Sequence, residues 1–449
     1  MARRVRLASL LALGAVLLTG GLVQSSPATT TAKRDGGTFR VSLTGPQFDH
    51  IDPALAYTPG SWALLDTVCA RLMTYPDKPP PAGFRVVPEV AAGPPRVSRD
   101  RRVYTFTIRN GFRFSNGQPV LASAFARAIN RTLALGLNTR TAPPSPVSPA
   151  AQYTRDIVGA GAVLAGRRRS ARGVVARGRT LVVRFTRPVP DFAAQTTMPF
   201  FCAVPPSLPV DPEGRRTFPG AGPYYVAQYR QGEQIVLRRN RFYGGKRPHH
   251  VDRFVVDLRP TSQGEVLDRV ERGLADWGYA VAPIYFEPGR NLRQKYGVNK
   301  SRFFVRPGFT LRMLVLNSSR PLFRDNPQLR RAVNYALDRE EMVAAVAGAQ
   351  GTGRLTDQYL QPRLPGFRDA AVYPLRRPNV RRARALARGH TRSGKATFYV
   401  PGFPPPLALA QVAKRQLARI GIDVTLRPIP FHVTNSGYLG RLGARGEPW

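Results

Sequence analysis

The first regular pattern in the chain is an alternation of apolar and polar positions over residues 36–43, which predicts a β-strand. Residues 61–75 follow with apolar side chains at four-residue steps, the spacing of one helix face, and Ser61 is a suitable N-cap. Residues 101–120 alternate again and contain two Asn-Gly steps, which are typical of tight turns. The beginning of the chain is therefore predicted to mix strands with helices.

The middle of the chain continues this mixture. Residues 221–245 carry two strand-like runs on either side of Gly232-Glu233, which predicts an antiparallel hairpin. Both alternating sets in its first strand contain apolar or aromatic residues, so we expect that strand to be covered on both faces. The remaining elements predicted here are a helix at 122–133, a strand and short helix at 180–198, a strand at 251–260 and a helix at 263–278.

The last third of the sequence has the pattern of an α/β unit. Asn326 and Pro327 are the cap and first residue of a predicted helix, whose apolar stripe is Leu329, Val333 and Leu337. A strand, a helix and a second strand then follow in order, which predicts two parallel strands joined by a helical crossover. These three elements occupy residues 396–402, 406–421 and 422–429.

Charge is the most unusual feature of the composition. The 449 residues, enough for two or three domains, include 68 Lys and Arg against 27 Asp and Glu, a formal charge of +41. A polyanionic partner would explain this excess, but so would a general compositional bias toward Arg, because arginines occur in every segment. The densest run lies at residues 165–179. We therefore expect a diffuse positive field rather than a specific nucleic-acid site, and no helix-turn-helix or zinc finger is present.

The N-terminus has the form of a secretory signal. Three arginines within the first six residues precede an apolar stretch at 7–23, and small residues then offer cleavage after Ala28 or Ala32. We assign residues 1–32 to a signal peptide, with an uncleaved membrane anchor as the alternative. No Cys follows the apolar stretch, so a lipoprotein is not expected. The protein is predicted to be exported, in the periplasm or at the outer face of the cell membrane.

Candidate chemistry is sparse. His249 and His250 are adjacent, but neighbouring side chains of a strand point in opposite directions, so we expect no metal site there. No nucleophile elbow and no zinc-protease motif occurs. We therefore predict neither an enzyme nor a cofactor. The two cysteines, Cys69 and Cys202, would meet an oxidising compartment, where they either pair or remain as buried thiols.

Several segments together resemble the family-5 extracytoplasmic solute-binding proteins, which bind oligopeptides, dipeptides or nickel for ATP-driven importers. The resemblance covers nearly everything after residue 35 and keeps the family's order. It is carried by "GGTFRVSL…IDPALAY", "YTFTIRNGFRFSNGQPVLASAF", "AGPYYVAQY…IVLRRNRFYGG", "LVLNSSRPLFRDNPQLRRAVNYALDREEMV" and "VAKRQLARIGIDV".

This resemblance implies an α/β fold of the periplasmic-binding-protein type II kind, with three lobes and mixed sheets. It places lobe I at 33–60 and 176–285, lobe II at 61–175, and lobe III at 286–449. It also implies a monomer that captures a peptide or small extended solute between hinged lobes and passes it to the membrane domains of an ABC importer. The alternatives are a non-transporting sensor or surface protein of the same fold, or a non-functional fragment.

The resemblance also suggests site residues. Family members that bind dipeptides use an Arg to clamp the ligand carboxylate, just after the strand that residues 396–402 resemble. In this sequence, the loop that follows the strand has three prolines and no Arg, which favours longer or non-peptide ligands. Cys69 and Cys202 fall in one neighbourhood of the first lobe, which predicts a disulfide with a Cα separation of about 4.4–6.8 Å. The candidate wall residues, whose alternative role is core packing, are Phe48, His50, Tyr57, Trp62, Asn317 and Phe403.

The resemblance raises one further expectation, at the C-terminus. In the family, the strand that residues 422–429 resemble is followed by a helix, a strand and an acidic loop that meets the α-amino group of a bound peptide. Here the sequence stops at Trp449. We therefore expect a truncated reading frame with an incomplete second large lobe, which binds peptide weakly.

Overall fold

The described residues from Gly36 onward belong to one compact unit of the chain. The structure is a computed structural model, and the account below is confined to the part of it that is described. That part comprises residues 35–44, 48–137, 148–214, 216–278, 292–305, 311–347, 354–362, 364–402 and 406–429.

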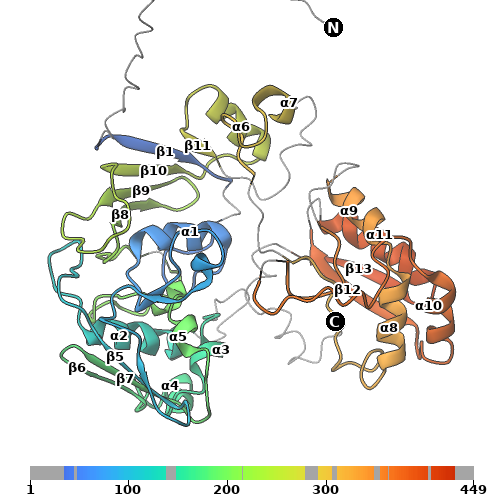
Figure 1. The fold of residues 1–449 in the computed structure, drawn as a ribbon, viewed down its shortest axis with the longest axis horizontal. Coiled ribbons are helices and arrows are strands. Elements are labelled where there is room, and N and C mark those ends of the chain that lie inside the picture. Colours follow the sequence, from blue (N-terminus) through green and yellow to red (C-terminus); the bar gives the residue numbers. More distant parts are fainter. Residues whose placement is uncertain are drawn as a thin grey trace, which may run out of the picture. The chain divides into compact units, whose positions relative to one another are not determined.

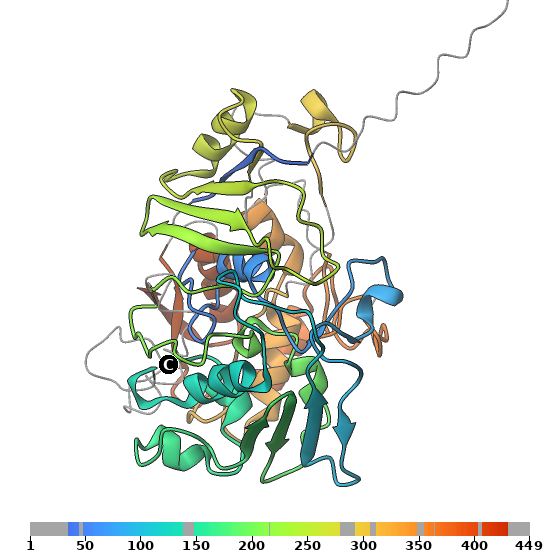
Figure 2. The same ribbon diagram turned by 90° about the vertical axis from the view of Figure 1, so that its left-hand side faces the viewer.

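A five-stranded sheet joins the start of the described chain to its middle (Figures 1 and 2). Strand β1 lies between β11 and β10 and runs parallel to both, while β8, β9 and β10 pair antiparallel in succession. The predicted hairpin at 221–245 is therefore present. The strands, in sheet order, are β11 (Trp277–Gly278), β1 (Thr38–Ser42), β10 (Arg253–Asp257), β9 (Gln234–Arg239) and β8 (Tyr224–Arg230).

Helix α1 (Pro59–Val68) packs on one face of this sheet and shares a core with it. Apolar residues of β8 that face this core, Tyr224 and Val226, are buried, whereas Ala227 is exposed. The expectation that this strand is covered on both faces is therefore wrong: the alternating side chains include tyrosines whose rings are only half-buried. The shared core includes Leu64, Leu65, Val68, Val226, Ile235, Leu237 and Val256.

A four-stranded antiparallel sheet forms a second core with helix α2 (Ala122–Leu133). Its inner face carries Tyr104, Phe106, Leu181 and Val183, all buried against α2 and neighbouring loops. Apolar and polar residues alternate around Tyr104 and Phe106 in the sequence, and this alternation causes the one-sided burial. The strands, in sheet order, are β4 (Arg96–Val97), β5 (Val103–Thr107), β7 (Thr180–Arg184) and β6 (Val174–Arg177).

The two cores divide the chain at other places than the sequence boundaries at 60/61 and 175/176. Strand β7 pairs with β5 along its whole length, so it belongs with the four-stranded sheet. Helix α1 packs instead with the five-stranded sheet. Core membership changes between Cys69 and Ala70 and changes back between Ala221 and Tyr224; within that stretch, Cys202 belongs to the core of the five-stranded sheet. Strand pairing between distant segments sets these limits, and it leaves no local mark in the sequence.

The C-terminal part has a core of its own. Strands β12 (Lys395–Pro401) and β13 (Asp423–Ile429) are parallel and are joined through helix α11 (Pro406–Ala418), as the crossover pattern predicts. The Asn326 side chain accepts a hydrogen bond from Leu329 N, so the predicted cap is also present. Figure 1 shows the helices gathered around the two strands. The other helices are α8 (Pro327–Ala336), α9 (Arg339–Ala347) and α10 (Val380–Ala387).

Two helices differ in length from the sequence expectation. Helix α1 begins at Pro59 because the Thr58 side chain caps it, and it ends at Val68 because Cys69 is extended. Helix α6 (Gln263–Glu271) ends early, and the chain then returns to pair with β1. The short elements are β2 (Met73–Thr74), β3 (Val87–Pro88), α3 (Ala151–Thr154), α4 (Ala160–Leu164), α5 (Phe192–Gln195), α7 (Leu292–Tyr296), and 3₁₀ turns at Ala82–Phe84, Leu135–Leu137 and Pro199–Phe201.

Among the described residues, no helix is both long enough and apolar enough to span a membrane.

Candidate ligand-binding site

Asp49 organises the loop that carries most of the candidate site residues. Its Oδ2 accepts hydrogen bonds from Tyr57 N at 2.8 Å and Thr58 N at 3.2 Å, and its Oδ1 accepts one from Thr58 Oγ1 at 2.9 Å. Its own N–H donates to Ser61 Oγ at 3.0 Å. These bonds close the loop onto the first turn of α1. A single carboxylate thus fixes the backbone on which Tyr57 is presented.

Tyr57 and Trp62 belong to an aromatic cluster completed by two residues from far along the chain. The Tyr57 ring stacks on Phe200 with centroids 6.4 Å apart, and Trp62 meets Phe200 edge-on at 5.5 Å. Tyr153 stacks on Phe200 at 6.1 Å. Burial, and to a smaller extent the neighbouring Tyr57, raises the pKa of the Tyr153 hydroxyl, so this hydroxyl stays protonated at neutral pH.

The exposed member of this cluster is Tyr57, with 37% of its surface open to solvent, whereas Phe200 is buried. The indole N–H of Trp62 donates to Ala56 O at 2.8 Å and is thereby held in place. A rigid aromatic ring backed by other rings loses little side-chain entropy when a ligand stacks on it. Tyr57 is therefore suited to stack against a ligand, whereas Phe200 packs in the core.

Phe48 and His50 flank Asp49 but point to other neighbours. The Phe48 ring lies 6.0 Å from Tyr229 of β8, at the margin of the core beneath the five-stranded sheet. His50 lies so close to Gly214 that a Cβ at that position would come within 2.7 Å of its Nδ1. Both contacts are those of packing residues, so neither ring joins the aromatic cluster.

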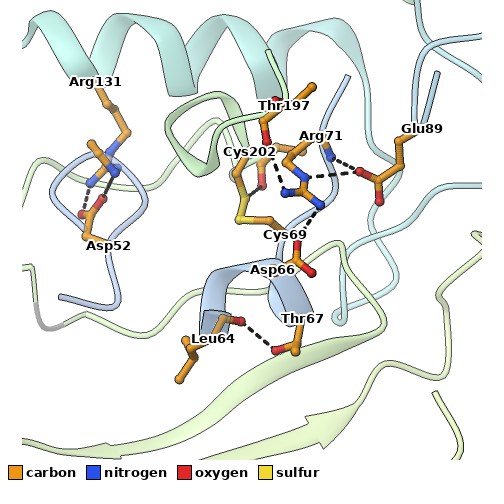
Figure 3. The surroundings of a disulfide bond; sticks show 12 residues. Asp52, Leu64, Asp66, Thr67, Cys69, Arg71, Glu89, Arg131, Thr197 and Cys202 are labelled. Atoms are coloured by element: carbon orange, nitrogen blue, oxygen red, sulfur yellow. Dashed lines mark hydrogen bonds and ion pairs between the residues drawn. A yellow bond between two sulfur atoms is a disulfide. The ribbon is translucent and has the colours of Figure 1, made fainter. Parts of the chain in front are cut away.

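A buried ion pair ties the same loop to the second core (Figure 3). Arg131 of α2 donates to Asp52 through both terminal nitrogens, at 2.8 and 2.5 Å, and the two side chains are 1% and 6% exposed. Arg131 also donates to Pro209 O. Burial, and secondarily the charge of Arg131, lowers the pKa of neighbouring Arg127. Asp52 is thus the counter-charge for a crowded pair of guanidinium groups.

The two cysteines belong to the core of the five-stranded sheet, whereas Ala70 and Ala203, which follow them in the chain, belong to the second core. Figure 3 shows the surroundings of the disulfide. The Cα atoms of Cys69 and Cys202 lie 5.3 Å apart and their sulfurs are bonded. Beside them Ala203 N donates to Ala70 O at 2.9 Å, so the two segments that carry the cysteines run side by side. Arg71 pairs with Asp66 at 2.6 Å and donates to Thr197 O. The disulfide and these polar contacts hold the two segments together.

The remaining candidates lie elsewhere. Asn317 belongs to the C-terminal part, where its Oδ1 accepts hydrogen bonds from the Ser319 backbone and hydroxyl, at 3.0 and 2.7 Å. This is the arrangement of a turn. Phe403 lies outside the described residues, as does the segment after residue 429. The structure therefore brings together Tyr57 and Trp62, with Phe48 and His50 on the same loop.

The described part of the chain contains no group of three or more metal-ligating side chains placed to hold an ion. His249 packs edge-on against Tyr243 at 5.6 Å, and its Nδ1 lies 3.0 Å from Arg247 O. This is a packing role within the loop after β9. What the aromatic loop offers is binding through stacking and backbone hydrogen bonds.

Sequence reasoning missed Asp49, Phe200 and Tyr153. The role of Asp49 could not be read from a local turn motif, because the backbone groups it binds lie eight and nine residues further along the chain. Phe200 and Tyr153 could not be found either, since they lie more than 90 residues from Tyr57 in the sequence and only the fold brings them to it.

Comparison with known proteins gives a family match over most of the chain. Residues 85–441 match the model of the bacterial extracellular solute-binding proteins, family 5 Middle. Protein XP55 of Streptomyces lividans is 28% identical over 356 residues, covering 76% of this chain and 56% of that protein. The oligopeptide-binding protein OppA of Bacillus subtilis is 26% identical, covering 61% and 48%. The chain thus spans about half the length of these relatives.

Solved structures share the fold. The clavulanic acid biosynthesis oligopeptide-binding protein 2 has a TM-score of 0.67 at 24% identity, covering 90% of this chain and 73% of that one. The binding protein DppA of Helicobacter pylori, in complex with the peptide STSA, has a TM-score of 0.65 at 18% identity, covering 92% and 76%. These are type II periplasmic binding proteins, so the mixed α/β fold class predicted from the sequence is confirmed.

Proposed function

Because the chain belongs to the bacterial extracellular solute-binding proteins of family 5, we propose that it captures an extended, peptide-like solute between hinged lobes. The family consists of solute-binding proteins, so the chain is not an enzyme. The observation that carries the proposal is the extent of the family match, which runs from the four-stranded sheet through β12, α11 and β13. A match of that length includes more than one lobe, and capture between lobes requires more than one.

The aromatic loop supplies the local chemistry for this role. Tyr57 is solvent-exposed on one side and stacked on Phe200 on the other, and Asp49 fixes its backbone. A ligand side chain or peptide plane that stacks on Tyr57 would meet a surface that is already ordered, which lowers the entropic cost of binding. Tyr57 and Trp62 are the residues we place in the ligand site; Phe48 and His50 support the loop.

The ligand class follows from the relatives and from one gap in the sequence. Relatives are named as binders of oligopeptides and dipeptides, and one as a heme-binding protein. The loop at 403–405 has no Arg to clamp a dipeptide carboxylate. We therefore propose a peptide longer than two residues as the first candidate. A small non-peptide solute is the second candidate, and the same missing Arg favours it.

Delivery to the membrane domains of an ABC importer completes the proposal, with an exported monomer as the working form. Importer partners recognise the closed, ligand-bound state in such systems, so ligand must bind the two conformations with different affinity. A sensor or surface protein of the same fold would share the ligand site and lack only the importer. Ligand binding is accordingly the step to test first.

A melting-temperature screen of the full chain tests ligand capture. The ligands are pools of dipeptides, tripeptides and pentapeptides, together with non-peptide solutes. A ligand present at 100 times its Kd stabilises the folded state by about 2.7 kcal/mol, so a true ligand raises the melting temperature by several degrees. We expect the tripeptide or pentapeptide pool to do this. If no peptide pool shifts the transition while a non-peptide solute does, the second candidate is correct.

Two variants locate the site within the same screen. Tyr57→Ala should weaken the shift at least about tenfold in ligand concentration, and Tyr57→Phe should preserve it, because stacking needs the ring rather than the hydroxyl. Tyr75→Ala is the control, since Tyr75 is also exposed and lies outside the cluster. Equal loss in Tyr57→Ala and Tyr75→Ala would exclude the aromatic loop as the ligand site.

A further inference from the structure

The outer face of the four-stranded sheet combines an apolar centre with arginines on its margins. The register pairs Val175 with Val182, and Val182 with Thr105 of β5, so these three side chains form a row across the sheet. Side chains two positions away share the same face. Arg177 and Arg184 therefore lie on either side of the row along the β6–β7 hairpin, and Arg96 of β4 ends the row opposite Thr105.

These three arginines are exposed and uncompensated. Arg96, Arg177 and Arg184 form no side-chain hydrogen bond or ion pair with any described residue. The sequence between Asp156 and Asp191 contains eight arginines and no carboxylate. Asp100, in the turn between β4 and β5, is engaged by Ser98 and Arg102. The outer face therefore carries positive charge without a local counter-charge.

The five-stranded sheet provides the contrast. Arg40 of β1 pairs with Asp276 at 2.8 Å, and Arg239 of β9 pairs with Asp252. Arg259, just after β10, pairs with Asp257 at 2.6 Å. In the same sheet Arg230, Arg238 and Arg253 form no ion pair with a described carboxylate, so that sheet mixes paired and unpaired arginines. On the outer face of the four-stranded sheet, all three arginines lack a carboxylate partner among the described residues.

We propose that this outer face binds the anionic headgroup surface of a phospholipid membrane. Four strands at their usual spacing make a surface roughly 15 Å wide, and a membrane is a broad, continuous array of phosphate groups. Arginines at the margins would pair with phosphates, while the half-buried Val175 and Val182 face the interface. A linear polyanion is better held in a groove, and this surface is the face of a sheet. The inference depends only on the sheet, not on the proposed ligand.

Vesicle binding by the full chain tests the proposal. The vesicles contain phosphatidylcholine, with or without about one third phosphatidylglycerol, in about 0.1 M salt, where charges interact only over roughly 10 Å. The triple variant R96Q/R177Q/R184Q is compared with R331Q/R381Q/R388Q, which removes the same charge from exposed arginines of the C-terminal part. Urea unfolding of each variant shows that it is folded. Any apolar binding common to all variants is measured on phosphatidylcholine alone.

We expect the wild type to prefer vesicles that contain phosphatidylglycerol. The sheet variant should lose about 10-fold to 100-fold in partition coefficient, because each interfacial Arg contributes about fivefold. The control variant should lose less than about threefold. Equal losses in both variants would overturn the proposal in favour of a diffuse field. Binding to soluble polyphosphate that depends on the sheet arginines, without vesicle binding, would overturn it in favour of a linear polyanion.

Discussion

Replacing Asp52 by Asn tests how firmly the aromatic loop is anchored. The side chain keeps its shape, and its Oδ1 can still accept from Ala54 N, a bond of 2.9 Å in the structure. What disappears is the negative charge that Arg131 contacts through both terminal nitrogens. Arg131 is 1% exposed, so it cannot turn to water for compensation.

The cost can be worked from this geometry. Removing one partner of a buried ion pair costs about 3–5 kcal/mol, because the other charge remains buried and unpaired. Arg131 retains Pro209 O as an acceptor, which lowers the cost, whereas the nearby Arg127 guanidinium adds repulsion that Asp52 no longer offsets. We therefore expect a loss of about 3 kcal/mol. Asp52→Asn combined with Arg131→Met should be more stable than Asp52→Asn alone, since no buried charge is then left over.

Urea unfolding followed by circular dichroism measures these differences. Asp100→Asn is the control, since Asp100 belongs to an exposed pair with Arg102 at 3.9 Å and its loss should leave the urea midpoint unchanged. A midpoint for Asp52→Asn equal to that of the wild type would show that the ion pair does not anchor the loop. A double variant less stable than Asp52→Asn would refute the argument from an unpaired buried charge.

Three further predictions concern the rest of the described fold. Replacing both Cys69 and Cys202 by Ser should lower the free energy of unfolding by about 5 kcal/mol in the loop-entropy model, given a sequence separation of 133; two free thiols on alkylation of the unreduced protein would contradict the disulfide. Gly222→Ala should cost about 3 kcal/mol in a urea titration, because its Cβ would lie 2.6 Å from Val68 C, whereas Gly93→Ala meets nothing within 4 Å and should change stability by less than about 0.5 kcal/mol. Burial acts to raise the pKa of Asp257, but hydrogen bonds from Arg259 and the charge of Arg269 outweigh it, so the pKa is lowered overall. The ionised Asp257 therefore stabilises the fold at pH values above its ordinary pKa, and this stabilisation is lost as the pH falls. Asp257→Asn should therefore be less stable than the wild type at pH 7, with a difference that narrows below about pH 4 in urea titrations; a constant difference would contradict this.

Local patterns in the sequence predicted the elements that depend on local causes. The Asn326 cap and the crossover that joins β12 to β13 follow from side chains close together in the chain, and both are present. The N-cap of α1 was misplaced by three residues because Ser61 and Thr58 are both good caps, and Pro59 at the first position decides between them.

Long-range features of the candidate site had no such local cause. Tyr57 and Trp62 stood out as aromatics near a loop, but Phe200, on which both pack, comes from a segment for which the sequence predicted no element. Arg131 was one of many arginines until the fold placed it on Asp52, 79 residues away. Partners this distant are chosen by tertiary packing, which is also why the limits of the two cores leave no local mark in the sequence.

Calorimetric titration of the full chain with tripeptide and pentapeptide pools tests the central claim most directly. Capture between lobes buries ligand and lobe surface together, so we predict saturable heat at about one peptide per chain. The heat-capacity change should be negative, the robust sign of buried apolar surface. Tyr57→Ala should weaken this binding, while Tyr75→Ala should not. The absence of saturable heat with dipeptide, tripeptide and pentapeptide pools alike, in a chain that melts cooperatively, would contradict a peptide-capturing function.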